Sequence, residues 1–277
     1  MTIDAIMPGV RVLCAVSGGV DSMYLLHQMT ALGAQRGFAV GCAHFNHGLR
    51  GAESDRDEAF VRAQCKKLGV PFYAGRGNVA SVRGMGTEAA ARELRYAFLA
   101  QCAQAHSYDW IATAHTADDN AETLLLNLAR GCGLRGLTGI STQVGRIVRP
   151  LMFASRKEIL EYAVQNHIPF REDSSNRSTK YLRNKIRLGL IPRIREINPK
   201  FTELMRKNLG RLTDAQLFIN HGIERIRDEA ITSEEGIDTI HPDRIDPAFP
   251  RGFVIYELLS SSYGFKGDVV DSLCRAL

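Results

Sequence analysis

Short apolar runs alternate with longer helical patterns over the first 170 residues of the 277-residue chain. The apolar runs, which are candidate strands, are Arg11–Val16, Phe38–Phe45, Pro71–Arg76, Trp110–Ala114 and Gly145–Arg149. The segments between them that are long enough for a crossover helix are Asp21–Leu32, Glu53–Leu68, Thr87–His106 and Asp118–Arg130. Parallel strands joined by helices produce this alternation, so the sequence predicts an α/β fold with a doubly wound, mostly parallel sheet.

The pattern changes in the last hundred residues. A capping box of Ser155 and Glu158 predicts a further helix that ends near Asn166. Beyond Pro169 the chain becomes polar and then basic, and helical patterns follow over Lys200–Arg227, Phe253–Ser261 and Asp268–Leu277. The acidic, proline-containing stretch Asp228–Pro250 predicts a linker or a surface loop. We therefore expect a sheet domain over residues 1–195 and a smaller, all-helical domain over residues 196–277.

The composition excludes several classes of protein. Hydrophobic residues make up 45% and charged residues 23% of the chain, which is ordinary globular usage and argues against disordered, collagenous and coiled-coil proteins. The six cysteines are scattered and form no CxxC pair, which indicates free thiols and neither disulfides nor a zinc or iron–sulfur site. No apolar stretch approaches a membrane span and no leader pattern is present, so we expect a soluble cytoplasmic protein without membrane contact.

The first candidate strand runs into Ser17-Gly18-Gly19-Val20-Asp21-Ser22, and a helix follows. Two glycines allow backbone N–H groups to approach an anion, the serines add hydroxyl donors, and the helix directs its positive dipole end to the same place. This segment predicts a phosphate-binding loop, to which all six residues contribute. The kinase-type GxxxxGK[ST] loop is absent, and Asp21 suits pyrophosphate held through Mg²⁺. The alternative is a simple Gly-Gly turn between strand and helix.

The second candidate strand ends in His44-Phe45-Asn46-His47-Gly48-Leu49-Arg50. Its polar groups emerge at the same sheet edge as the first loop, because the carboxyl ends of parallel strands meet there. His44 and Asn46 are therefore candidate contacts for an adenine or a ribose. A turn whose polar groups satisfy one another is an equally good interpretation of these residues.

The fourth candidate strand is followed by a cluster of acidic residues. His115, Asp118 and Glu122 stand at helical or near-helical spacing, and Asp119 lies beside them. The simple interpretation is helix capping, since carboxylates are favoured at a helix N-terminus. Because the cluster shares its sheet edge with Asp21, we favour a second Mg²⁺ ligand or a carboxylate that binds an amine.

Two further groups of arginines are candidates for anion contacts. The third helix contains Glu88, Arg92, Arg95 and Tyr96, of which Glu88, Arg92 and either Arg95 or Tyr96 fall on one face. This face suits either a solvated ion-pair surface or an arginine placed over a reacting phosphate. From residue 171 to residue 211 there are twelve Lys or Arg against four Asp or Glu, although the whole chain carries only +5. This excess predicts a positive stripe that tracks an RNA backbone and includes Arg177, Lys180, Arg183 and Arg187; an exposed charged helix is the alternative.

Together these segments resemble the tRNA(Ile)-lysidine synthetase family. The resemblance covers Arg11 to about Asn198 and rests on SGGVDS, HFNHGLR, the Glu88/Arg92/Arg95/Tyr96 helix, AHTADDNAET, Arg149-Pro150-Leu151, DSSN and RNKIR, which follow the motif order of the family. It implies an adenine-nucleotide α hydrolase-like fold of the PP-loop type over residues 1–195 and a helical substrate-binding domain after it. Beyond Asn198 only helical character and length agree.

The resemblance also implies a reaction. ATP adenylates the wobble cytidine of tRNA(Ile) with a CAU anticodon at C2, pyrophosphate leaves, and the ε-amine of L-lysine displaces AMP to form lysidine. Family membership implies that the loop holds ATP, that Asp21 with Asp118 or Asp119 binds Mg²⁺ or the lysine ammonium, and that Arg92 lies near the reacting phosphate. The groups implied to meet tRNA or lysine are His115, Glu122, Arg177, Arg183, Asn184 and Arg187.

Three alternatives share the phosphate loop: a tRNA thiolase, a small-molecule adenylating amidotransferase and a nucleotide-sensing module without catalysis. A thiolase usually needs closely spaced cysteines, and an amidotransferase has no need of the basic stripe. Longer members of the resembled family carry further C-terminal domains that help to hold tRNA, so the tRNA affinity of this chain is an open question. The oligomeric state also stays open, and a homodimer is among the outcomes.

Overall fold

The computed structural model describes residues 7–48, 51–77, 84, 86–172, 182–265 and 267–276. The chain divides into two compact units, Met1–Asn208 and Leu209–Leu277. This division falls inside a long helix, α9 (Phe201–Ala230), and therefore later in the chain than the expected division after residue 195. None of the described helices is long and apolar enough to cross a lipid bilayer.

The first unit contains a six-stranded sheet in the order β3-β2-β1-β4-β6-β5. Five strands pair in parallel, and β5 runs antiparallel to β6, so the predicted mostly parallel sheet is confirmed. The strands are β1 (Arg11–Ala15), β2 (Ala39–Asn46), β3 (Phe72–Arg76), β4 (Trp110–Ala112), β5 (Gln143–Val144) and β6 (Ile147–Val148). The chain passes from β1 outward to β2 and β3, and then returns to the other side of β1 with β4. This reversal between β1 and β4 is the switch point at which open α/β sheets bind ligands.

The fifth predicted strand is shorter than expected. Instead of Gly145–Arg149, only Ile147 and Val148 pair with β4, and the preceding residues form the antiparallel strand β5. Gly145 has a φ of +53° and lies in the tight turn between β5 and β6, which removes it from the strand. The predicted strand therefore becomes one arm of a hairpin at the sheet edge.

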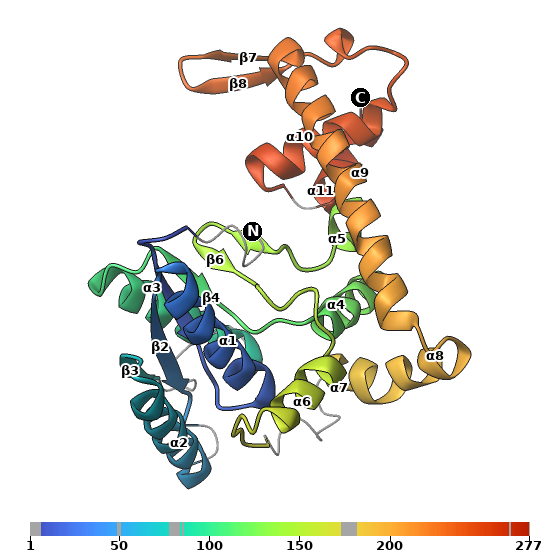
Figure 1. Ribbon diagram of the computed structural model, residues 1–277. Helices are drawn as coiled ribbons and strands as arrows, with labels where there is room; N and C mark the ends of the chain where they lie inside the picture. Colours follow the sequence, from blue (N-terminus) through green and yellow to red (C-terminus); the bar gives the residue numbers. More distant parts are fainter. Residues whose placement is uncertain are drawn as a thin grey trace. The chain divides into compact units, whose positions relative to one another are not determined.

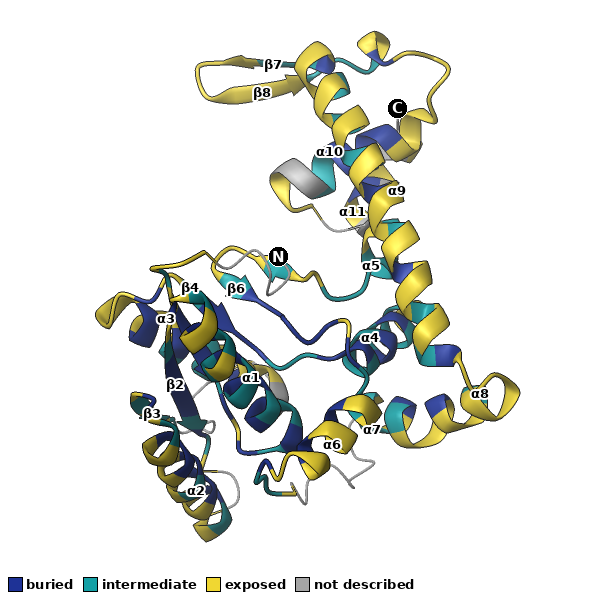
Figure 2. Ribbon diagram, in the orientation of Figure 1, coloured by how far each residue is buried: buried dark blue, intermediate teal, exposed yellow. Residues whose placement is uncertain are grey.

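Helices cover both faces of the sheet, as Figure 1 shows. On one face α1 (Val20–Arg36), α2 (Ala52–Leu68) and α6 (Arg156–Gln165) pack against a core that includes Val12 and Cys14. On the other face α3 (Thr87–Ala105) packs against a smaller core that includes Leu13. Side chains alternate between the faces along β1, and both sets are buried, which is expected for a parallel strand inside a doubly wound fold (Figure 2).

A third apolar cluster joins α4 (Ala117–Arg130) to the helices that begin at residue 182. Ala121 packs with Ile186, Ile191 and Phe201, which lie in a helical path after residue 181. This path consists of α7 (Leu182–Lys185), a π-helical turn over Ile186–Leu190, α8 (Ile191–Ile197) and the start of α9; the short α5 (Leu134–Leu137) follows α4. The packing holds the basic helices against the acidic start of α4.

The second unit is mostly helical but not all-helical. The later part of α9, α10 (Arg251–Tyr263) and α11 (Gly267–Ala276) are helices, and the core of the unit includes Leu258 and Ile245. The stretch predicted as a linker instead contains a hairpin of β7 (Ile231–Glu234) and β8 (Ile237–Ile240), followed by a 3₁₀ turn over Pro242–Arg244. Glu235 and Gly236 both have positive φ, as the central residues of a type I′ turn require. The prediction of a linker or a surface loop is therefore wrong for residues 231–244, which form a hairpin and a 3₁₀ turn.

Candidate active site

The loop after β1 folds around the side chain of Ser22. Its hydroxyl oxygen lies 3.2 Å from the backbone nitrogens of Ser17 and Gly18, which donate to it, and it donates to the carbonyl of Gly19 at 2.9 Å. Gly18 has a φ of +100°, a conformation that glycine adopts without strain. These bonds curl the loop over the start of α1, which is the shape expected of a phosphate-binding loop.

The start of α1 has no side-chain cap. Gly19 occupies the N-cap position and accepts the first helical bond from Met23 at 3.0 Å, but no side chain accepts from the first turn. The N–H groups of the first turn and the positive end of the helix dipole therefore face the same place. An oxyanion is the natural partner for such a terminus, and the loop residues 17–22 are placed as the sequence predicts.

One oxygen of the Asp21 carboxylate is left without a hydrogen-bond donor in the described part of the chain. This oxygen, Oδ1, is buried. Burial raises the pKa of Asp21 to about 6; Arg156 opposes this shift, the neighbouring carboxylate of Asp119 adds to it, Arg187 opposes it, and Asp118 adds to it. A buried oxygen left without a donor suits a metal cation, which the side chain would meet beside the phosphate loop.

The acidic residues of α4 are, by contrast, fully engaged. Asp119 closes a capping box: its Oδ2 accepts from the backbone nitrogen of Thr116 at 2.9 Å, and Thr116 Oγ1 accepts from the backbone nitrogen of Asp119 at 3.3 Å. Asp118 accepts from the backbone nitrogen of Arg156 at 2.7 Å and pairs with the guanidinium of Arg195. Asp119 therefore is a cap residue, as the simpler interpretation expected, and the metal role of Asp118 stays a prediction.

Arg183 and Arg187 form an ion-pair cluster with Asp119 and Glu122. Arg183 Nε lies 2.9 Å from Glu122 Oε2, and Arg187 Nε lies 2.5 Å from Glu122 Oε1. Both guanidiniums also donate to Asp119 Oδ1, at 3.1 and 3.2 Å. Burial raises the pKa of Asp119, but Arg183, the Thr116 N–H, His115 and Arg187 outweigh it, and the net pKa is lowered. We refer to these four side chains as the arginine–carboxylate cluster.

Arg183 and Arg187 are ion-paired and partly buried, and do not lie on an exposed charged face. Their side chains are only 27% and 24% exposed, and carboxylates that lie 61 to 68 residues earlier in the chain neutralise them. Asn184 is half-buried in α7, whereas Lys185 and Lys200 are exposed. Arg177 and Lys180 lie outside the described residues, and a role of any of these residues toward tRNA stays a prediction.

His115 lies among cationic side chains at the end of β4. Its Nδ1 atom is 2.9 Å from Thr113 Oγ1. Burial lowers the pKa of His115 to about 4; Asp119 opposes this shift, and Arg149, Arg95 and Arg183 add to it. His115 is therefore neutral near pH 7, and the positive charges of Arg149, from the end of β6, and Arg95, from α3, both favour its neutral form.

Arg92, which the family resemblance places near the reacting phosphate, is exposed, and its guanidinium lies 4.8 Å over the ring of Tyr96. Arg95 is half-buried and lies 5.3 Å over the same ring; burial lowers its pKa. The positive charge of Arg95 also contributes to the lowered pKa of His115. The side chain of Glu88 on this helix lies outside the described residues. Helical spacing alone does not distinguish between Arg92 and Arg95, and a role of either arginine toward a phosphate stays a prediction.

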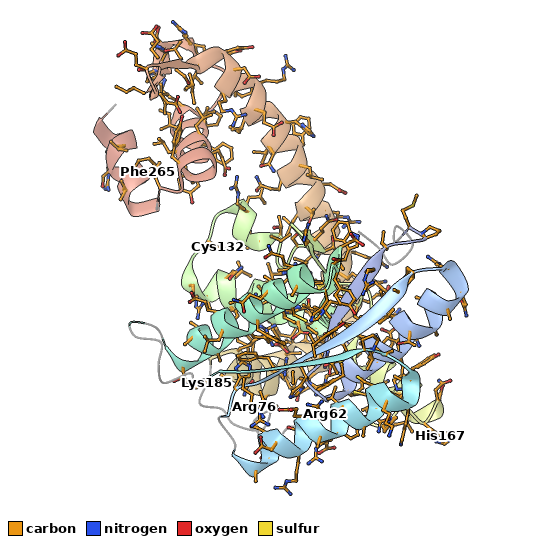
Figure 3. The ribbon with its side chains drawn as sticks, turned by 90° about the vertical axis from the view of Figure 1, so that its left-hand side faces the viewer. Arg62, Arg76, Cys132, His167, Lys185 and Phe265 are labelled. Carbon is orange, nitrogen blue, oxygen red and sulfur yellow. The ribbon has the colours of Figure 1, made fainter. Side chains whose placement is uncertain are left out.

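The polar side chains at the end of β2 are hydrogen-bonded to other residues of the same chain. Asn46 is buried; its Nδ2 donates to Asp55 at 3.1 Å and to Glu58 at 3.4 Å, and its Oδ1 accepts from the Gly48 nitrogen at 2.9 Å. Glu58 also accepts from Arg62 and Arg76, which lie near one another on α2 and β3 in Figure 3. For Asn46 the geometry therefore matches the satisfied polar turn.

His44 is likewise buried and partnered. Its Nδ1 donates to the carbonyl of Val16 at 2.8 Å, and burial lowers its pKa, so the ring is neutral at pH 7. This bond ties the end of β2 to the residue that precedes the phosphate loop. A contact of His44 or Asn46 with a nucleotide stays a prediction, since each already has a structural role beside the loop.

The residues at the sheet edge fit Mg²⁺ bound together with a phosphate ligand. Within the described residues, no group of three or more His, Cys, Asp and Glu side chains is arranged to hold a metal ion by itself. Mg²⁺ does not need such a group, because it is commonly bound by one or two carboxylates, water and the phosphates of a substrate. The orphaned Oδ1 of Asp21 beside the uncapped start of α1 matches this kind of site.

Comparison with solved structures identifies the fold. The chain is similar to a U34-tRNA thiolase from Methanococcus maripaludis that holds a [4Fe-4S] cluster, with a TM-score of 0.64 over 76% of this chain and 74% of that one. The sequence identity is 17%, so the likeness concerns the fold alone. Of the cysteines whose side chains are described, Cys132 is exposed and the other four are buried.

Comparison with curated sequences finds tRNA(Ile)-lysidine synthases. The relative from Bacteroides thetaiotaomicron is 37% identical over 98% of this chain, and that from Dehalococcoides mccartyi is 34% identical over 97%. A third, from Chlorobaculum tepidum, is 43% identical over 74% of this chain. The chain spans about three fifths of the length of these relatives, with 62%, 61% and 62% of each covered. A family model described as a PP-loop domain matches residues 3–194, more than half of the chain. The chain therefore belongs to the PP-loop domain family.

Proposed function

We propose that this protein forms lysidine on tRNA(Ile) with a CAU anticodon, using ATP and L-lysine. The observation that carries the proposal is its identity of 34–43% to curated tRNA(Ile)-lysidine synthases, two of which align with nearly the whole chain. The site supports it, because the uncapped start of α1 and the unpartnered Oδ1 atom of Asp21 lie beside each other at the switch point of the sheet. Residues 1–195 would then carry the chemistry, and residues 196–277 would assist substrate binding.

The loop residues 17–22 would hold the triphosphate. Backbone N–H groups at the start of α1 are free of side-chain caps and face an anion without reorganisation. If they hold the β- and γ-phosphates, the α-phosphorus stays open to attack. The O2 oxygen of the cytidine then bonds to that phosphorus as the bond to pyrophosphate breaks, and the lysine ε-amine adds at C2 as AMP departs with the oxygen.

Asp21 would bind Mg²⁺, which when present neutralises charge on the phosphates. The carboxylate must be ionised for this purpose. Burial raises its pKa, so the ionised form is unfavourable unless a cation is bound beside it. Asp118 is the second candidate ligand from the same edge. Its bonds to Arg195 and to the Arg156 nitrogen would have to be exchanged before it could bind a cation.

The arginine–carboxylate cluster supports binding of an amine. Asp119 and Glu122 present two carboxylates to cationic partners, and Glu122 is almost completely buried. A lysine ammonium could take the place of one guanidinium without leaving a buried carboxylate unpaired. A guanidinium released in this way could then meet an RNA phosphate, which is how Arg183 and Arg187 would serve the proposed tRNA contact together with Asn184 and Arg177.

The test is incorporation of labelled lysine. The 277-residue chain is incubated with ATP, Mg²⁺, labelled L-lysine and tRNA(Ile) with a CAU anticodon, and we expect label in the tRNA with equal amounts of AMP and pyrophosphate. Methionine tRNA, which has the same anticodon, is the matched RNA control and should stay unlabelled. Release of ADP, or sulfur incorporation without any need for lysine, would refute the proposal, and the second result would indicate a thiolase.

A further inference from the structure

Two arginines at the sheet edge have no acidic partner. Arg95 and Arg149 both act on His115, yet neither forms an ion pair with an Asp or Glu in the described part of the chain. Arg183, the third guanidinium that acts on His115, is neutralised by Asp119 and Glu122. The positive charges of the arginine–carboxylate cluster are therefore neutralised by carboxylates, whereas those of Arg95 and Arg149 are not neutralised by any Asp or Glu among the described residues.

Arg149 is the more unusual of the two. Only 7% of the residue is exposed; its Nη1 donates to the carbonyl of Ser141 at 2.6 Å, and its Nε is buried without an acceptor. A buried charge without a counter-charge is strongly unfavourable, and a buried donor without an acceptor adds to that cost. An anionic ligand that accepts from Arg149 would remove both deficits.

The sheet register places Arg149 level with Thr113, the residue that contacts His115. Ala112 pairs with Val148, and the nitrogen of the following Thr113 donates to the carbonyl of Val148 at 3.0 Å. Thr113 and Arg149 therefore leave adjacent strands at the same level, and Thr113 Oγ1 in turn lies 2.9 Å from His115 Nδ1. Arg149 therefore leaves the same sheet edge as the segment that leads through His115 to the carboxylates of α4.

We propose that Arg149, assisted by Arg95, binds the α-carboxylate of the amino acid that the enzyme attaches to RNA. This inference rests on the proposed function. An amino acid carries both charges, and this edge offers both complements: carboxylates of α4 for an ammonium, and unpaired guanidiniums for a carboxylate. The planar guanidinium matches a carboxylate in two parallel hydrogen bonds. A phosphate oxygen shares this chemistry, but the phosphate loop and Asp21 on the β1 side already provide for the triphosphate.

The test compares L-lysine with 1,5-diaminopentane, which is lysine without its carboxylate. Because a site built to bind a polar group rejects the analogue that lacks it, we expect the unaltered protein to prefer lysine by about a hundredfold or more in kcat/KM. Arg149→Met should lower kcat/KM for lysine by about tenfold to a hundredfold and leave that for 1,5-diaminopentane unchanged. Arg149→Lys, which keeps the charge, should restore part of the preference.

Two controls separate this role from folding. Arg146 is exposed on the same hairpin, and Arg146→Met should leave both amines unaffected. Should Arg149→Met fail to fold, Arg95→Gln tests the same subsite from α3 and should raise the KM for lysine while the KM for ATP stays constant. An equal loss for both amines, or a raised KM for ATP alone, would overturn the proposal and assign the arginines to phosphate or to structure.

Calorimetric binding of the two amines, without RNA, separates the two proposals. Preferential binding of lysine that is lost in Arg149→Met supports the carboxylate subsite even if no lysidine forms, an outcome that would refute the proposed function alone. Lysidine formation by a protein that binds lysine and 1,5-diaminopentane equally well would refute the subsite alone.

Discussion

Two sets of carboxylates at one sheet edge differ in their hydrogen-bond and ion-pair partners. Asp21, after β1, has a buried oxygen without a donor, whereas Asp119 and Glu122, after β4, each accept bonds from two arginines. Because of this difference, burial raises the pKa of Asp21, whereas the arginines beside Asp119 lower its pKa. Asp21 therefore keeps an oxygen that suits a cation, whereas the α4 carboxylates are neutralised within the protein by Arg183 and Arg187.

The largest expected effect is that of Asp21→Asn on turnover. Removing the carboxylate should lower the rate of lysidine formation by about 10²–10³, because the charge it places beside the phosphates is lost. The melting temperature should stay constant or rise, since an unpartnered buried carboxylate is replaced by a neutral group. A variant with normal turnover, measured by labelled lysine and pyrophosphate release, would contradict the assignment of the loop.

Glu122→Gln should act in the opposite way, on stability. Its side chain is only 2% exposed and balances two guanidiniums, so its loss should lower the free energy of unfolding by about 3 kcal/mol. Adding Arg187→Met should recover part of this loss in urea titrations, because one uncompensated cation is removed.

The matched control for Glu122→Gln is Glu161→Gln, which breaks an exposed i,i+4 pair with Lys157 and should change stability by less than about 0.5 kcal/mol. Equal effects of the two substitutions would show that the buried cluster does not support the fold.

Two capping boxes offer an internal comparison. Thr116→Ala at α4 and Ser155→Ala at α6 remove equivalent bonds and should each cost about 1 kcal/mol in thermal unfolding. Only Thr116→Ala should also lower turnover, because Thr116 orients Asp119 within the arginine–carboxylate cluster. A loss of turnover in both variants at matched temperatures below their melting points would mean that the difference between the regions is smaller than we infer.

The smallest effect is expected for Arg195→Ala. This half-exposed guanidinium pairs with Asp118, which keeps a second bond from the Arg156 nitrogen, so stability should fall by less than about 1 kcal/mol. If Asp118 binds the metal, freeing it should lower rather than raise the Mg²⁺ concentration needed for half-maximal activity. A higher requirement would exclude Asp118 as a ligand.

The sequence predicted the parts of the site that depend on local order. Loop residues 17–22 and the acidic start of α4 follow strands directly, so alternation of apolar runs was sufficient to place them at one edge. The pairing of Arg183 with Glu122 was missed, because its partners are 61 residues apart and a local count of charge takes no account of distant carboxylates. The unpaired Arg149 was missed for a related reason: the absence of a partner appears only after folding.

The hairpin of β7 and β8 was missed although a signal was available. Acidic residues and prolines dominate the stretch 228–250 and favoured a linker. Isoleucines at 231, 237 and 240, arranged around the dipeptide Glu235-Gly236, are compatible with two short strands and a two-residue turn. Composition averaged over twenty residues concealed a pattern that occupies only ten.

The pairing of β1 with β4 fixes the position of the loop after β1, which carries Asp21, relative to the segment after β4, which carries His115. Only three residue pairs join these strands, Val12 with Trp110, Leu13 with Ile111 and Cys14 with Ala112, yet they link segments almost a hundred residues apart. A shift of one residue along this ladder would displace Asp21 relative to His115 by about 3.3 Å, more than the length of a hydrogen bond. The relative position of Asp21 and His115 is therefore fixed by apolar residues in the interior of the sheet, which lie outside the site itself.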